Sequence, residues 1–219
     1  MNKEWAELNK KLQSHFKKND TYKSGLETLF ELRDQLMSVI DSFKDDLTRE
    51  DFDAMPFINA DGYHSKNIAY SLWHIFRIED IVAHTIIACD EQILFSGNYK
   101  ERINSPVITT GNELMKEQIA AFSKQLDIDE LYSYIWEVKR STEEILKKIP
   151  YDSLKKKVPS EMKEKLIVSK TVSENENAAW LIDYWCGKDI RGLIQMPFSR
   201  HWIMHTEACL RIENKLNKK

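Results

Sequence analysis

The stretch SGLETLFELRDQLMSVIDSFKDDL, residues 24–47, decides the fold class. Its apolar residues recur at steps of three, four and seven, a spacing that places them on one face of a long α-helix. The residues of this face are Leu26, Leu29, Phe30, Leu36, Met37, Ile40, Phe43 and Leu47. A helix of this kind must bury its apolar face against other helices or a sheet, so the rest of the chain has to supply that partner.

Further helical segments follow along the chain. A second helix is predicted from about residue 64 or 67 to 89, and it is apolar enough to be largely buried. Pro197 suits the first turn of the last helix, and a Lys-rich loop with a short helix is expected over 150–173. The other predicted helices cover residues 3–18, 111–125, 129–149, 174–185 and 190–195.

Four of these helices are long, which predicts an all-α, up-and-down four-helix bundle with additional short helices. We expect a single domain over residues 1–219, with a core of about 24–216 and an N-terminal extension over 1–20.

Composition excludes several other classes of protein. With 6 Gly and 5 Pro, the chain lacks the turn residues of a many-stranded β fold. A formal charge of −3 disfavours a nucleic-acid-binding surface. The polar N-terminus and the absence of a long apolar run predict no signal peptide, no membrane span and a cytoplasmic location. The 3 cysteines suggest neither a disulfide framework nor a CxxC site.

The segment SRHWIMH, residues 199–205, places two imidazoles four residues apart. On a helix, His201 and His205 would lie about 40° apart around the axis and about 6 Å apart along it, so both could face one metal ion. The spacing alone is a weak signal, because six histidines in 219 residues produce it by chance in an appreciable fraction of sequences.

A third ligand is available at His74, in the most apolar part of the second helix. The alternative is a core histidine satisfied by one hydrogen bond. His84 cannot bind the same ion as His74, because ten helical residues separate them by about 15 Å. His15 and His64 are expected to be ordinary surface histidines.

The segments NIAYSLWHIFRIED (67–80) and RHWIMHTE (200–207) resemble the DinB/YfiT-like metalloenzyme family, and the likeness extends over roughly residues 24–216. In that family one histidine of the second long helix joins an HxxxH pair on the last one. The resemblance implies that His74, His201 and His205 bind the metal. It also implies an enzyme that activates a low-molecular-weight thiol, of the bacillithiol or mycothiol type, for S-transfer or isomerisation.

Three neutral imidazoles leave a divalent metal such as zinc, nickel or iron with an open position, as in catalytic sites. The predicted function is therefore metal-dependent chemistry on a small-molecule substrate, with a thiol as possible cosubstrate. The alternative is a non-catalytic helical module with a structural or vestigial metal site that binds a partner. A di-iron carboxylate site is excluded, because the positions three before each candidate histidine carry no Glu. Those positions are Ser71, Ile81, Phe198 and Trp202.

Four further residues are candidates for the pocket or for contacts with the ligands. Tyr70 and Arg77 lie one turn on either side of His74 and could face the cavity. For Arg77, however, an ion pair with Glu79, Asp80 or a carboxylate of the last helix is favoured over binding of a substrate carboxylate. Arg200 and Glu207 flank the HxxxH pair and could orient an imidazole. No catalytic acid or base is assigned. Cys209 is expected to be a buried, inert thiol, and Trp73 and Trp202 to be packing residues.

A homodimer is a further possibility, because aromatic residues cluster on one helix, where they could form an interface or pack internally. These residues are Tyr132, Tyr134 and Trp136.

Overall fold

The computed structural model describes residues 2–218 and is all-helical, as predicted. Within these residues no β-strand occurs, and the only strand-like feature is an isolated bridge between Lys157 and Asp189.

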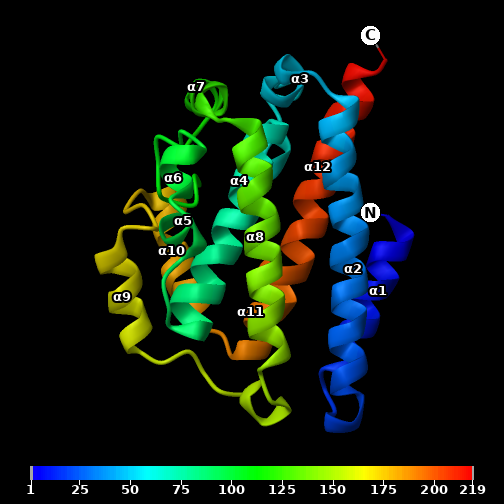
Figure 1. Cartoon of the computed structure of the whole chain (residues 1–219), viewed down its shortest axis with the longest axis vertical. Helices are drawn as coiled ribbons and strands as arrows, with labels where there is room; N and C mark the ends of the chain where they lie inside the picture. Colours follow the sequence, from blue (N-terminus) through cyan, green and yellow to red (C-terminus); the bar gives the residue numbers. More distant parts are fainter. Residues whose placement is uncertain (1, 219) are drawn as a thin grey trace.

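Four long helices run side by side along the molecule (Figure 1). Helix α4 packs against α8 and α12, and α2 packs against the same two helices. Most of the predicted apolar face of α2 is buried: Leu29, Leu36, Ile40 and Phe43 are fully inaccessible to solvent. The other members of that face that are only partly buried are Leu26, Phe30 and Leu47. The bounds of these helices are α2 (Asn19–Asp46), α4 (Ile68–Asp80), α8 (Ile128–Lys147) and α12 (His201–Leu216).

Helix α4 is buried on every side. All of its residues from Ile68 to Asp80 are inaccessible or nearly so, including the charged ones. Its first turn is capped by the side chain of Asn67, which accepts a hydrogen bond from the backbone nitrogen of Tyr70 at 2.9 Å. A π-helical segment, η2 (Ile81–Ala88), continues it to the loop at Cys89. The second helix therefore ends where the sequence predicts.

The direction of the helices differs from the expected up-and-down order. In Figure 1, α2 and α12 run toward the top of the view, whereas α4 and α8 both run toward the bottom. Two neighbouring helices that run parallel need a long return (crossover) connection between them. Residues 89–127 provide it, because they lead from the end of η2 back to the start of α8. Local periodicity predicts each helix but not its direction, since direction depends on where the connections go.

The return connection carries three short helices: α5 (Ile93–Ser96), α6 (Tyr99–Arg102) and α7 (Glu117–Gln125). The helix predicted over 111–125 therefore begins later than expected. Gly111 has φ +77°, a left-handed conformation that cannot belong to a right-handed helix.

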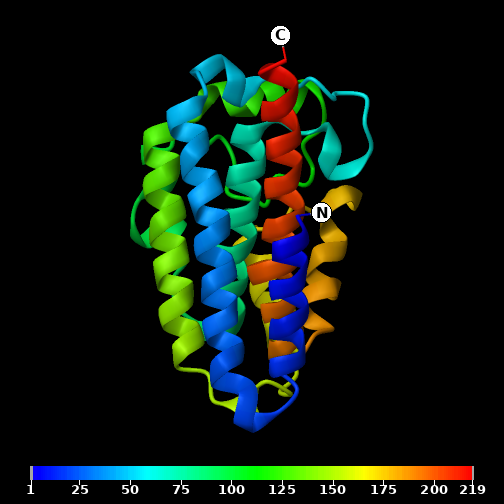
Figure 2. The ribbon, with the colours of Figure 1, turned by 90° about the vertical axis from the view of Figure 1, so that its right-hand side faces the viewer.

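The N-terminal helix α1 (Lys3–His15) runs along α2, with Trp5 and Leu12 buried (Figure 2). The backbone nitrogen of Asn2 donates a hydrogen bond to the carboxylate of Glu207 on α12. The N-terminal extension is thus packed against the long helices.

The second half of the chain adds shorter elements between α8 and α12. Residues 150–173 form a loop with a short α-helix, as expected, and also contain a 3-10 turn. Pro197 lies in a π-helical segment that leads into α12. The short elements between α8 and α12 are η3 (Tyr151–Ser153), α9 (Glu161–Ser169), α10 (Glu176–Cys186), α11 (Ile190–Gln195) and η4 (Met196–Arg200). Two further short elements lie in the first half of the chain: α3 (Arg49–Asp53) and η1 (Gly62–Ser65).

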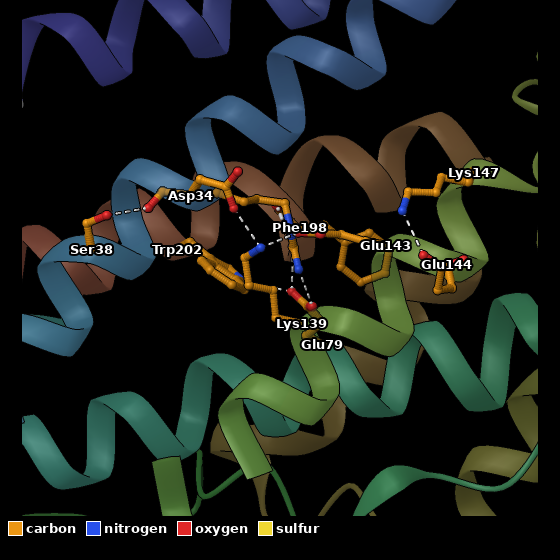
Figure 3. A network of polar contacts seen from close by, with 10 residues as sticks. Asp34, Ser38, Glu79, Lys139, Glu143, Glu144, Lys147, Phe198 and Trp202 are labelled. Carbon is orange, nitrogen blue, oxygen red and sulfur yellow. Dashed lines mark hydrogen bonds and ion pairs between the residues drawn. The ribbon is translucent and has the colours of Figure 1, made fainter. Parts of the chain in front are cut away.

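A buried network of charges ties the long helices together (Figure 3). The guanidinium of Arg33 on α2 binds both oxygens of Glu79 on α4, at 2.9 and 2.8 Å, and both side chains are fully buried. Arg33 also pairs with Glu143 on α8 at 3.0 Å. Lys139, one turn before Glu143, extends the network to Asp34 at 2.7 Å. These contacts fix α2, α4 and α8 relative to one another.

The aromatic cluster on α8 does not form an exposed patch. Tyr132 and Tyr134 are buried in the core, and Trp136 alone of the three is exposed. This removes the sequence-based reason to expect a homodimer. Among the residues that the structure describes, no helix combines the length and the apolar character needed to cross a membrane.

Candidate metal centre

His74, His201 and His205 lie together, although 127 residues separate the first two along the chain. His74 comes from α4, whereas His201 and His205 occupy the first turns of α12. One possible ligand atom from each ring lies within 4.8 Å of the others, and all three residues are buried. The Nε2 atoms of His74 and His201 are 3.2 Å apart. The three histidines that the fold brings together are therefore the three that were predicted from the sequence.

This spacing fits a metal ion. At zinc–nitrogen distances of about 2.0–2.1 Å, two nitrogens of a tetrahedral site lie about 3.3 Å apart. The Nδ1 atoms of His201 and His205 are buried and have no hydrogen-bond partner among the described residues. Three imidazoles at this spacing are a donor set that suits a divalent transition metal.

His74 is held by the return connection. Its Nδ1 lies 2.7 Å from the carbonyl oxygen of Thr110, so Nδ1 carries the proton and Nε2 is left as the ligand atom. Tyr70 stacks on the same imidazole at 5.5 Å between ring centroids, and its hydroxyl donates to the carbonyl of Gly111 at 2.9 Å. The turn at residues 110–111 thus fixes both the orientation and the tautomer of His74.

A π-helical segment precedes the HxxxH pair. Segment η4 (Met196–Arg200) widens the helix immediately before His201, and such segments are frequent at functional sites. The carbonyl of Phe198 accepts a hydrogen bond from Nη1 of Arg33 at 3.2 Å. The buried charge network therefore reaches the helical turn that presents His201.

The three imidazoles are electrically neutral in the absence of metal. Burial lowers the pKa of His74 to about 4. Burial and the neighbouring histidines hold the pKa values of His201 and His205 well below the ordinary range. Neutral imidazole is the form that binds a metal ion, so no proton has to leave these rings near pH 7.

A cavity of about 770 Å³ adjoins the three histidines, within the size range of small-molecule sites. Its wall combines apolar and aromatic side chains with a few polar groups, and all three histidines line it. Among the other lining residues are Tyr63, Lys66, Ile78, Asn112, Leu181, Tyr184, Trp185 and Met204.

The structure brings one of the four predicted neighbours to this cavity. Tyr70 lines it next to His74. Arg77 does not line it: its guanidinium pairs with Asp80 at 2.9 Å and donates to the carbonyl of Ile108 at 2.9 Å. Arg77 is therefore not part of the pocket, and it forms the buried ion pair that the sequence favoured for it.

The two predicted neighbours on the last helix lie elsewhere. Arg200 is exposed and Glu207 is half-buried, and neither lines the cavity. Glu207 binds the N-terminal segment through Asn2. Cys209 is fully buried, and burial raises the pKa of its thiol to about 12, as expected for an unreactive thiol.

His84 lies apart from the three histidines, as its spacing predicts. Its Nδ1 is 2.6 Å from Asp90 and its Nε2 is 3.1 Å from the hydroxyl of Ser141. Both ring nitrogens of His84 therefore have protein partners.

Sequence reasoning missed Lys66, Thr110 and the two π-helical segments. Thr110 acts through its backbone carbonyl, a group that every residue type has, so the sequence does not reveal this role. The π-helical segments lack a sequence signature, although Pro197 marks an irregular helix start. Lys66 stands just before an apolar helix and looks like an ordinary surface lysine.

Comparison of the chain with protein-family models gives no match, and comparison with curated proteins gives no match either.

Proposed function

We propose that the chain is a metal-dependent enzyme of the DinB/YfiT-like type, in which His74, His201 and His205 hold one divalent transition metal. The four long helices, with one ligand on α4 and two on α12, support the assignment to this type of bundle. The observation that carries the proposal is the buried three-histidine group at the wall of a cavity large enough for a small molecule.

The proposed reaction is S-transfer or isomerisation with a low-molecular-weight thiol of the bacillithiol or mycothiol type as cosubstrate. A bound divalent metal would lower the pKa of a coordinated thiol or water and polarise a substrate oxygen. In an S-transfer, a new S–C bond forms, the leaving group departs with the electrons of the broken bond, and the thiol proton passes to solvent. Zinc, nickel and iron(II) all suit the ligand set.

The residues around the histidines favour this chemistry. Ile78, Leu181 and Trp185 supply apolar walls that limit the access of water to the reacting atoms. Thr110 and Tyr70 hold His74 in the orientation in which Nε2 faces His201. A closed structural site would need a fourth protein ligand in place of the cavity.

The test is turnover by metal-loaded protein. Purified chain loaded separately with zinc, nickel or iron(II) is incubated with cysteine, bacillithiol or mycothiol and with 1-chloro-2,4-dinitrobenzene as the electrophile, and thioether formation is followed by absorbance. We expect a metal-dependent rate above the uncatalysed one that disappears in His201→Ala. The control Trp136→Ala changes an exposed aromatic on α8 outside the cavity and should keep the rate.

The alternative, a non-catalytic module with a structural metal, predicts a different pattern. In that case the protein would bind stoichiometric metal, show no rate with any thiol, and lose much of its thermal stability on chelation. That combination would overturn the enzyme proposal.

A further inference from the structure

Lys66 places a positive charge inside the cavity that holds the three histidines. It lies between η1 and α4, is half-buried, and lines the cavity together with His74 and His205. Its Nζ lies 5.2 Å from the centre of the Tyr70 ring and 3.4 Å from the carbonyl oxygen of Leu114. Tyr70 itself stacks on His74. The Tyr70 ring therefore contacts both the ammonium group of Lys66 and the imidazole of His74, a proposed metal ligand.

This ammonium lacks a carboxylate partner in the described part of the chain. The carbonyl of Leu114 and the ring of Tyr70 are its two polar or aromatic contacts, and both are neutral. Burial lowers the pKa of Lys66, and no acidic side chain offsets that effect. Most other partly buried cations of this protein are paired: Arg33 with Glu79, for example, and Lys139 with Asp34. A cation withdrawn from water without a counter-ion is costly, and an anionic ligand would remove that cost.

The rest of the cavity restricts what such an anion can be. Beyond the histidines, the apolar and aromatic part of the wall includes Ile78, Leu181, Tyr184, Trp185 and Met204, which suit an apolar or aromatic body. The polar part includes Asn112, Asn177 and the exposed Asp61. Lys116, the second cation at this cavity, is exposed at its rim. Apart from the proposed metal ion, Lys66 is, among the described residues, the one partly buried cation at this cavity, and one ammonium group balances one negative charge. A monocarboxylate on an apolar body therefore matches the cavity better than a doubly charged phosphate does.

We propose that Lys66 binds the carboxylate of an apolar organic acid, whose body lies against Leu181, Tyr184 and Trp185 while its other end faces the three histidines. This inference rests on the proposed function in one respect, namely that the cavity is the substrate site of the metal centre. It adds the chemical class of the substrate, an aromatic or aliphatic monocarboxylate, and the residue that selects it.

The test measures binding rather than turnover, by isothermal titration calorimetry on zinc-loaded and on chelator-treated protein whose helical content has been checked by circular dichroism. The probes are 3-phenylpropionate, its uncharged analogue 3-phenylpropionamide, and propionate, which keeps the carboxylate but lacks the ring. We expect 3-phenylpropionate to bind about tenfold more tightly than the amide, because a charge-assisted hydrogen bond is lost in the amide. We expect propionate to bind at least tenfold more weakly than 3-phenylpropionate, because it leaves the apolar wall uncovered.

Three variants assign the effect to Lys66. Lys66→Met keeps the aliphatic stem and should bind 3-phenylpropionate and its amide equally. Lys66→Arg keeps the charge and should retain the preference for the carboxylate. Lys116→Met removes the exposed cation at the rim and should behave like the wild type within about twofold.

The outcomes separate this inference from the proposed function. Zinc binding without any carboxylate preference, or a preference that survives in Lys66→Met, would overturn the Lys66 site and leave the metal centre standing. A preference seen only in zinc-loaded protein and retained in Lys66→Met would mean that the metal binds the carboxylate, which also overturns it. A Lys66-dependent preference in protein that takes up no zinc would support the carboxylate site while removing the metal-dependent function.

Discussion

The carboxylate of Glu79 accepts a hydrogen bond from the indole nitrogen of Trp202 at 2.7 Å. Glu79 lies five residues after His74 on α4, and Trp202 directly follows His201 on α12. The same carboxylate binds Arg33, whose guanidinium lies 4.3 Å from the centre of the Trp202 ring. One buried anion therefore connects the helix of the first proposed metal ligand with the helix of the other two.

Removal of the Glu79 charge should destabilise the fold strongly. Glu79→Gln keeps the size of the side chain but leaves Arg33 with Glu143 as its single carboxylate partner, so we expect a loss of about 3–5 kcal/mol in the free energy of unfolding. Urea denaturation followed by circular dichroism measures it. Trp202→Phe removes only the indole hydrogen bond and some volume, and should cost about 1–3 kcal/mol. The double change Arg33→Met/Glu79→Leu should cost less than Glu79→Gln. A double variant at least as unstable as Glu79→Gln would show that this ion pair itself is a strong source of stability.

The turn that holds His74 should control metal affinity. Gly111 has φ +77°, and a Cβ there would lie 3.0 Å from Cε2 of Tyr70. Gly111→Ala should therefore displace Tyr70 or the neighbouring Thr110 carbonyl and weaken zinc binding at least tenfold, in a competition titration with a chromogenic chelator.

Gly62 provides the matched control for that substitution. It also has a positive φ, +60°, but a Cβ there would have no atom within 4 Å. Gly62→Ala should suffer a similar backbone strain of about 1 kcal/mol yet bind zinc within twofold of the wild type. Equal zinc affinities for the two variants would contradict the role given to the 110–111 turn.

Metal-free protein should lose stability as the pH falls below about 6.5. The pKa of His74 is lowered from 6.5 to about 4 in the folded state, so between these values the unfolded chain binds more protons than the folded one. The stability that depends on neutral His74 is complete above pH 6.5 and is lost progressively down to pH 4. Its steepest slope is about 1.4 kcal/mol per pH unit for this one group.

Urea denaturation of chelator-treated protein at pH 7.5, 6.0 and 5.0 measures this slope. His201 and His205 shift in the same direction and add to it. His74→Gln cannot take up the proton, so its unfolding free energy should depend less steeply on pH than that of the wild type. Parallel curves for the two proteins would contradict the assignment to His74.

The parts of the fold that follow from local periodicity could be read from the sequence. The apolar face of residues 24–47 predicts α2, and the spacing of His201 and His205 predicts that both rings point to one side of α12. The apolar pattern of the sequence does not show that His74 joins the other two histidines. Helix α4 is buried on every side, so its pattern does not indicate which side meets α12. The resemblance to a known family supplied that choice.

The features that could not be predicted depend on long-range packing. The parallel course of α4 and α8, for example, is set by the 89–127 connection (Figure 1). The position of Lys66 at the cavity could not be predicted from the sequence either. Its charge matters because the fold places it at a cavity where no carboxylate of the described residues forms an ion pair with it, the acidic residue of the wall, Asp61, being exposed. Residue type alone does not reveal that.

The central claim is that three histidines hold one metal ion, and elemental analysis of untagged protein, purified without a nickel column or added chelator, tests it most directly. We predict about one equivalent of a transition metal per chain in the wild type and none in His201→Ala/His205→Ala, with the helical content of both proteins unchanged. A folded wild-type protein that contains no metal and also takes up neither zinc nor nickel on titration would contradict the claim.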